Sequence, residues 1–162
     1  MNTSAYLTHR LREVLTSGKW VTGTNFKAQI LNTSWKDAIV SIDGLNSIAK
    51  LTFHIHYYIE GVTKVLEGGP LEIRDAYSFN APPIQSEADW KDLTHKFCVD
   101  SEKFIALVEK MTDGALQDIF VDEKYGNYQR NIDVMMEHTY YHLGQILLIK
   151  KLINKRRKTS NL

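Results

Sequence analysis

The sequence Glu137-His138-Thr139-Tyr140-Tyr141-His142-Leu143-Gly144-Gln145-Ile146 lies within a helical period that extends from about residue 128 to residue 155. His138 and His142 are four residues apart, so their imidazole rings lie one above the other on a single helix face. Two nitrogen ligands need this arrangement to share one metal ion. The positions that flank this face are apolar, and they are Met135, Ile146 and Ile149. We therefore expect both histidines to point into the protein.

A helical period also occurs in three other segments, at about residues 3–17, 46–67 and 86–111. Four amphipathic helices with little strand signal predict an all-α fold, a four-helix bundle that occupies residues 1–162 as one domain. Residues 19–44 are too apolar for a solvated loop. We expect them to form one or two short helical turns packed on the bundle.

A long connection separates the second and third predicted helices. Gly68-Gly69-Pro70 ends the second helix, and Ser86 with Asp89 begins the third as a weak form of the capping box. The chain between them is rich in aromatic residues and proline, and we expect it to cross one end of the bundle in extended form. A crossover of this length permits the helices that it joins to be parallel neighbours.

The composition is that of a globular protein. Of 162 residues, 43% are hydrophobic and 24% are charged, which excludes a disordered or fibrous chain. Six of the 20 basic residues lie in residues 150–162, where no acidic residue occurs, so the rest of the chain has 14 basic and 19 acidic residues. A body with that negative excess is a poor surface for phosphate, and we expect no nucleic-acid partner. The basic run is more typical of a solvated, frayed helix end.

Cysteine content and hydropathy favour a cytoplasmic protein. Cys98 is the only cysteine, so no intramolecular disulfide can form, and a reducing compartment suits the chain. We read Cys98 as a small core residue and not as a nucleophile. No apolar run approaches the ~18 residues of a membrane span, and the first residues have no apolar signal-peptide core. We expect no membrane association.

The second predicted helix contributes a third histidine. His54 shares the apolar stripe with Leu51 and Tyr58, whereas His56 lies about 200° further round the helix, so we do not expect both to face the core. A site built from two helices would use His54. Each buried ring nitrogen without a partner costs about 1–3 kcal/mol, and one shared cation satisfies three of them.

Three neutral imidazoles suit Zn²⁺, Ni²⁺ or Fe²⁺, and the residues do not choose between these ions. Three protein ligands would leave a coordination position for water or substrate. Thr139 follows His138 where a zinc protease of the familiar type has its glutamate, so we do not expect that chemistry. The alternative is that the histidines are core residues bonded to their neighbours.

Two segments resemble the DinB-like (YfiT-like) superfamily of bacterial four-helix-bundle metalloproteins. They are Leu45-Asn46-Ser47-Ile48-Ala49-Lys50-Leu51-Thr52-Phe53-His54-Ile55-His56-Tyr57-Tyr58 and the block from Glu137 to Ile146. The resemblance implies a bundle with a long crossover and, in many members, a homodimer. It also implies a divalent metal held by His54, His138 and His142. Some members transfer a low-molecular-weight thiol such as bacillithiol, and others are described as metal-dependent hydrolases.

Further features bear on the site and on assembly. Tyr58, Tyr141 and Gln145 are expected near the histidines, either orienting a metal-bound water or substrate or packing around the ligands. No catalytic residue is assigned. The fourth predicted helix also carries a second apolar stripe. Either the bundle buries this helix on most sides or a partner chain covers part of it, and we favour a homodimer. This stripe consists of Met136, Tyr140, Leu143 and Leu147.

The favoured function is a metal-dependent enzyme that activates water or a low-molecular-weight thiol, as a hydrolase or a thiol S-transferase, on an unidentified small molecule. The alternative is a non-catalytic bundle in which the metal is structural and the role is partner binding or stress response. The residues alone leave open whether the protein is an enzyme.

Overall fold

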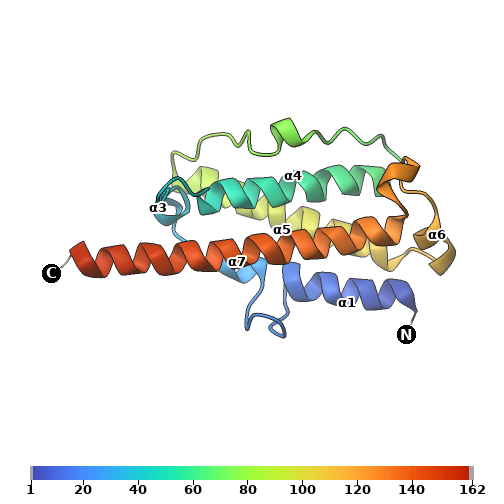
Figure 1. The fold of residues 1–162 in the computed structure, drawn as a ribbon, viewed down its shortest axis with the longest axis horizontal. Helices are drawn as coiled ribbons and strands as arrows, with labels where there is room; N and C mark the ends of the chain where they lie inside the picture. Colours follow the sequence, from blue (N-terminus) through green and yellow to red (C-terminus); the bar gives the residue numbers. More distant parts are fainter. Residues whose placement is uncertain (1, 161–162) are drawn as a thin grey trace.

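Four long helices pack along one another in the computed structural model, which describes residues 2–160 (Figure 1). They are α1 (Thr3–Leu15), α4 (Ile48–Leu66), α5 (Glu87–Glu109) and α7 (Tyr128–Ser160). The shorter helices are α2 (Phe26–Leu31), α3 (Trp35–Ala38) and α6 (Asp113–Gln117), with 3-10 turns η1 (Asp75–Tyr77) and η2 (Glu123–Tyr125).

The described chain contains no strand, only one isolated bridge between Ile119 and Asn127. The all-helical prediction is therefore confirmed, and α2 and α3 are the short helical turns expected within residues 19–44. Of the predicted 1–162 domain, Met1, Asn161 and Leu162 lie outside the described residues.

Small polar residues begin the two helices that the crossover joins. Ser47 caps α4 by accepting from the amide of Lys50, and Ser86 forms the expected capping box with Asp89 at the start of α5. α4 ends at Leu66, two residues before Gly68, whose φ of 87° lies in the left-handed region that favours glycine. These signals fix where the crossover leaves α4 and where it enters α5.

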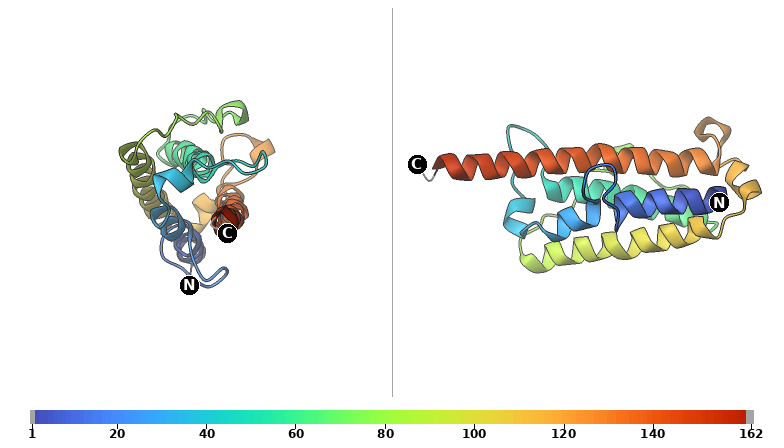
Figure 2. Two further views of the ribbon diagram at one scale, coloured as in Figure 1. Left: turned by 90° about the vertical axis from the view of Figure 1, so that its left-hand side faces the viewer. Right: turned by 90° about the horizontal axis from the view of Figure 1, so that it is seen from below.

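The four long helices have two directions (Figures 1 and 2). α4 and α5 are parallel neighbours, and α1 and α7 run the opposite way, each packed on its neighbours. The chain must therefore return over the length of α4, about 28 Å, before it can begin α5. The crossover runs along the outside of α4, so our expectation that it crosses one end of the bundle was wrong.

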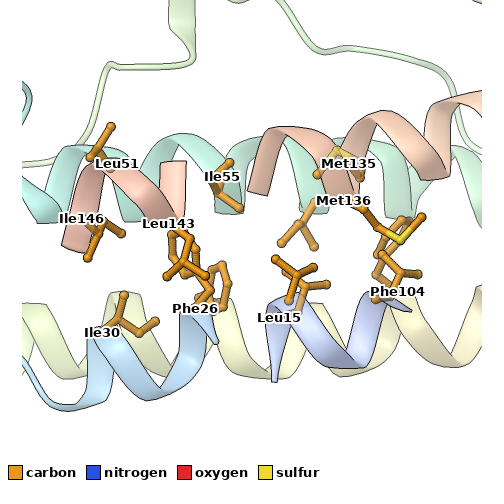
Figure 3. Packing of buried hydrophobic residues seen from close by; sticks show 14 of the residues in the cluster. Leu15, Phe26, Ile30, Leu51, Ile55, Phe104, Met135, Met136, Leu143 and Ile146 are labelled. Atoms are coloured by element: carbon orange, nitrogen blue, oxygen red, sulfur yellow. The ribbon is translucent and has the colours of Figure 1, made fainter. Parts of the chain in front are cut away.

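The second apolar stripe of α7 is covered by the chain itself. Met136 and Leu143 belong to the buried core, among residues of α1 and α2 such as Leu15 and Phe26 (Figure 3). Tyr140 and Leu147 pack partly buried against that core. The stripe therefore requires no partner chain, and the homodimer stays a prediction. The large apolar residues of α7 that remain exposed are Val134, Tyr141 and Leu148.

The basic end of α7 is helical, and its side chains contact the segment before α4 that contains α2 and α3. The Lys150 ammonium donates to the carbonyl and the side-chain oxygen of Gln29, at 3.1 and 2.9 Å. Arg156 pairs with Asp43 at 2.6 Å, and Arg157 pairs with Asp37. The expectation of a frayed end was wrong, because these contacts hold the helix to Ser160. Within residues 2–160, none of the helices combines the length and the apolar character needed to cross a bilayer.

Candidate metal centre

α4 and α7 bring three histidines together at the middle of their shared face. Nε2 of His138 lies 3.0 Å from Nε2 of His54 and 2.9 Å from Nε2 of His142. One potential ligand atom from each residue lies within 4.8 Å of the others. His54 and His142 are each only 6% exposed, and His138 is half-buried. The predicted convergence of one imidazole from α4 and two from α7 is confirmed.

The outer nitrogens of two rings are occupied by oxygen acceptors. Nδ1 of His54 lies 3.2 Å from the carbonyl oxygen of Ser78, and Nδ1 of His142 lies 2.8 Å from Oε1 of Gln145. A carbonyl oxygen only accepts, so each Nδ1 carries the ring proton. The neutral tautomer then leaves a lone pair on Nε2, and both of these lone pairs point toward His138. Ligating histidines in proteins are oriented in the same way.

This arrangement leaves too few protons for a hydrogen-bonded cluster. His138 has one Nε2 and can donate from it to only one of its two neighbours, so at least one short nitrogen–nitrogen contact places two lone pairs face to face. A cation accepts all three lone pairs at once. Nitrogens around a tetrahedral zinc ion are about 3.3 Å apart, close to the two separations that involve His138. The donor set therefore fits a divalent metal of the borderline class.

The electrostatics of the cluster keep the imidazoles neutral, which is the state that binds metal. Burial, followed by the proximity of His142 and His54, lowers the pKa of His138 to about 4. Burial and the neighbouring His142 lower the pKa of His54, and burial lowers that of His142.

The crossover supplies a wall of the site that the sequence did not indicate. The Phe79 ring stacks on the His54 ring, with centroids 3.9 Å apart and planes 11° apart. Ser78, the neighbour of Phe79, is the residue whose carbonyl holds His54. The aromatic character of this segment was visible in the sequence, but nothing in it revealed that these residues lie over α4. That placement follows from the parallel arrangement of α4 and α5.

The three residues expected near the histidines all lie there, in different roles. Gln145 holds His142 through Nδ1, as described above. Tyr58 packs edge-on against His54 and His138, at centroid distances of 5.1 and 5.2 Å, and its hydroxyl donates to Asp75 at 2.7 Å. Burial, with this hydrogen bond, raises the pKa of Tyr58 to about 12. The Tyr141 ring lies edge-on to His142 at 4.9 Å and is 64% exposed.

His56 is buried as well, contrary to the expectation that only one of the two α4 histidines would face the interior. It is 7% exposed, and its Nε2 lies 2.6 Å from Oδ2 of Asp100 on α5. α4 contacts both α5 and α7, so two of its faces are interior faces. A helix with a single core face would bury only one of the two histidines, and α4 has two such faces.

Two cavities flank the histidine cluster along the groove between α4 and α7. One, of about 320 Å³, is lined by Tyr58, Asp75 and Val134 among others. The other, of about 310 Å³, is lined by Leu51, Gln145 and Leu148 among others. Their α7 residues are about one turn before His138 and about one turn after His142.

Comparison with protein-family models, curated proteins and solved structures finds no significant match to this chain. The case for a function therefore depends on the residues and geometry described above.

Proposed function

We propose that the protein is a metal-dependent enzyme of the DinB-like kind, a four-helix bundle in which His54, His138 and His142 hold one divalent ion. The observation that carries the proposal is the meeting of three Nε2 atoms, in two of whose rings Nδ1 faces an oxygen acceptor. The order of the helices and the long crossover support the family resemblance, which otherwise depends on the two histidine blocks.

The reaction class follows from the number of protein donors. Within residues 2–160, no cysteine, aspartate, glutamate or fourth histidine joins the cluster. Catalytic metal sites commonly have three protein ligands and one position for water or substrate. When bound, a divalent ion at such a site acts as a Lewis acid and lowers the pKa of a water or thiol ligand. Hydrolysis and thiol transfer both begin with such a nucleophile.

The chain's own residues would orient and enclose the reacting group. The Ser78 carbonyl and the Gln145 side chain fix the ring planes of His54 and His142. Phe79 covers His54 from the crossover side and keeps water from that face. Tyr58 keeps its proton, because its pKa is about 12, and its hydroxyl is directed to Asp75. Tyr58 is therefore a positioning residue and not a general base.

A structural role for the metal is the second candidate, and one observation favours it. The cluster joins α4 to α7, and His54 also fastens the crossover through Ser78 and Phe79. An ion there would hold three segments that are distant in the chain. The partner-binding or stress-response function of such a bundle would then lie on its surface.

Metal analysis tests whether the site is loaded. Protein purified without added metal or chelator should contain about one divalent ion per chain, as a three-histidine site requires. The His142→Ala variant should contain almost none. His95→Ala is the matched control, because His95 is exposed on α5, and it should retain the ion. Wild-type protein without stoichiometric metal would contradict both candidate functions.

Cobalt substitution then separates the two candidates. Adding a small thiol to the Co²⁺-loaded protein should produce a sulfur-to-cobalt charge-transfer band, because a catalytic site has a position that an added ligand can take. An unchanged visible spectrum at saturating thiol would assign the metal a structural role.

A further inference from the structure

A second concave region lies on the other side of α4, between α4 and α5. Its volume is about 710 Å³, and residues Ala81 to Ile84 of the crossover form part of its wall. Volumes of this size are typical of small-molecule sites. His54 faces α7 and the histidine cluster, whereas His56 faces α5 and this cavity. The two regions share no lining residue, so this inference is independent of the proposed metal chemistry.

Toward the N-terminal ends of the two helices the cavity has most of its apolar lining, beside Asp89 and Asp92. Because α4 and α5 are parallel, residues early in one helix lie beside residues early in the other. Ala49 and Phe53 come from α4, and Ala88 and Leu93 come from α5. The crossover adds further apolar groups to the wall. These are Ala81, Pro82, Pro83 and Ile84.

The cavity is polar and acidic further along the same helices. His56 and Glu60 lie one turn apart on α4, and Lys96 and Asp100 lie one turn apart on α5. Nε2 of His56 lies 2.6 Å from Oδ2 of Asp100. Within residues 2–160, no hydrogen bond involves Oδ1 of that carboxylate. Lys96 pairs with Asp92 at 2.7 Å, and the charges of Glu60 and Asp100 also act on its ammonium group.

The charge of the lining has a definite sign. Four carboxylates line the cavity against one ammonium group, so the lining is negative by two even if His56 is counted as a cation. The carboxylates are Glu60, Asp89, Asp92 and Asp100. Asp89 is committed to the cap of α5, and Asp92 to its ion pair with Lys96. Within residues 2–160, neither Glu60 nor Asp100 forms an ion pair with Lys96, and the 3.5 Å contact of Glu60 with Lys64 is exposed and weak, so both carboxylates can receive a ligand.

We infer that this cavity binds a small amphipathic amine, with its apolar body between Phe53, Leu93 and the prolines and its ammonium group at Glu60 and Asp100. An ammonium group offers three donors and a positive charge to carboxylate acceptors. An alcohol of the same shape matches the apolar end but not the charge. A carboxylate of similar shape meets the negative lining directly.

Methyl-detected NMR titration tests the assignment with three matched probes. These probes are 2-phenylethylamine, 2-phenylethanol and phenylacetate, added to the metal-free and to the zinc-loaded full chain. The amine should shift the methyl signals of Ala49, Ile84 and Leu93 with a Kd of about 1 mM, as its size allows. The alcohol should bind about tenfold more weakly, and phenylacetate should leave these signals in place.

Variants locate the two ends of the ligand. Asp100→Asn and Glu60→Gln should each weaken the amine about tenfold and leave the alcohol unchanged. Glu60 is half-exposed, so its variant keeps the test valid even where Asp100→Asn disturbs packing. Ala88→Leu should fill the apolar end and abolish binding of both probes. Glu102→Gln, an exposed acid of α5 that does not line the cavity, is the control and should change nothing.

Two results would overturn the inference. One is phenylacetate or 2-phenylethanol binding as tightly as the amine, which would show that the acidic end recognises no cation. The other is amine binding that survives Ala88→Leu or moves only the signals around His142, which would place the amine elsewhere. Neither result would bear on the metal analysis proposed for the histidine cluster.

Discussion

Each of the two interior faces of α4 carries one histidine, and the two histidines have opposite kinds of partner. On the α5 side, Nε2 of His56 meets a carboxylate oxygen, and the donor and the acceptor satisfy each other. On the α7 side, Nε2 of His54 meets Nε2 of another histidine, whose second neighbour is a third. His54 and His56 are only two residues apart, yet His56 makes a complete hydrogen bond, whereas the Nε2 atoms around His54 have too few protons to bond to one another.

This difference shows that burial alone does not mark a ligand. His54 and His56 are equally buried, and both lie in the middle of α4. What distinguishes them is where their protons can go: His54 gives its proton to a main-chain carbonyl and keeps a lone pair for the cluster. A count of hydrogen-bond donors and acceptors distinguishes a histidine that is fully hydrogen-bonded in the core from one whose lone pair is free to bind a cation. Substitutions on the α7 face and on the α5 face of α4 should therefore have different effects on metal binding and on stability.

Removing one ligand should have the largest effect. At a free zinc concentration about 1,000 times the Kd, binding to the folded state alone adds about 4 kcal/mol to the free energy of unfolding. For a chain of this length that corresponds to a rise in Tm of about 10 °C. In His142→Ala this zinc-dependent rise should disappear. Thermal denaturation with and without zinc, followed by circular dichroism, measures it.

The control for that experiment is on the other face of α4. His56→Ala removes a histidine equally buried but not part of the cluster, so its Tm should be lower throughout while the zinc-dependent rise remains. Loss of the rise in His56→Ala as well would mean that the two faces are not distinct.

Acid should destabilise the metal-free protein through the cluster. The pKa of His138 is about 4 in the folded state and about 6.5 in the unfolded chain. Between these pH values the unfolded chain holds a proton that the folded protein does not, so the free energy of unfolding rises with pH through this window and levels off above it. After allowance for the exposed part of the ring, the loss from pH 7 to pH 4 is about 2–3 kcal/mol.

Urea denaturation of chelator-treated protein at several pH values measures this loss. His138→Gln cannot titrate, so its pH dependence should be shallower than that of wild type over the same window. Carboxylates that titrate elsewhere contribute equally to both proteins and cancel in the difference. Equal slopes would assign the acid sensitivity to other groups.

The sequence predicted the parts of this contrast that depend on one helix at a time. Four-residue spacing placed His138 and His142 on one face, and the apolar stripe placed His54 with them. It did not predict that α4 has two buried faces, because that depends on how many neighbours a helix has. For the same reason the sequence left open whether the bundle or a partner chain covers the apolar stripe of α7, and the structure shows that α1 and α2 cover it.

The path of the crossover was also beyond sequence reasoning. Its length permitted parallel helices, but the position of Ser78 and Phe79 over His54 follows from the register between the crossover and α4. The capping boxes and glycines that define helix ends carry no such long-range information. The residues that complete the site are therefore the ones that local patterns could not supply.

The hydrogen bond between His56 and Asp100 should contribute less to the free energy of unfolding than metal binding does. Asp100→Ala leaves Nε2 of a buried histidine without its partner, which costs about 1–3 kcal/mol in the free energy of unfolding. Metal content should stay at the wild-type value, because Asp100 does not touch the cluster. Asp92→Ala is the matched control, since this exposed acid of α5 pairs only with Lys96 and its loss should change stability by less than about 1 kcal/mol. A fall in metal content in Asp100→Ala would couple the two faces.

The smallest of these effects sharpens the role of the oxygen acceptors. Gln145→Met keeps the length of the side chain but removes the oxygen that holds Nδ1 of His142. The ring then loses the partner that fixes its tautomer and its plane, and losses of this kind lower metal affinity about 10- to 100-fold. Competition with a chromophoric zinc chelator measures the change, and Lys151→Met, an exposed substitution further along α7, is the control. The metal-free variant should lose no more than the about 1–3 kcal/mol expected for Asp100→Ala, because Nδ1 of a buried ring loses its partner in the same way. An unchanged affinity would mean that packing against Tyr141 alone orients His142. The contact of His54 with the Ser78 carbonyl would then be the one remaining contact that fixes the position of a ring proton in the cluster.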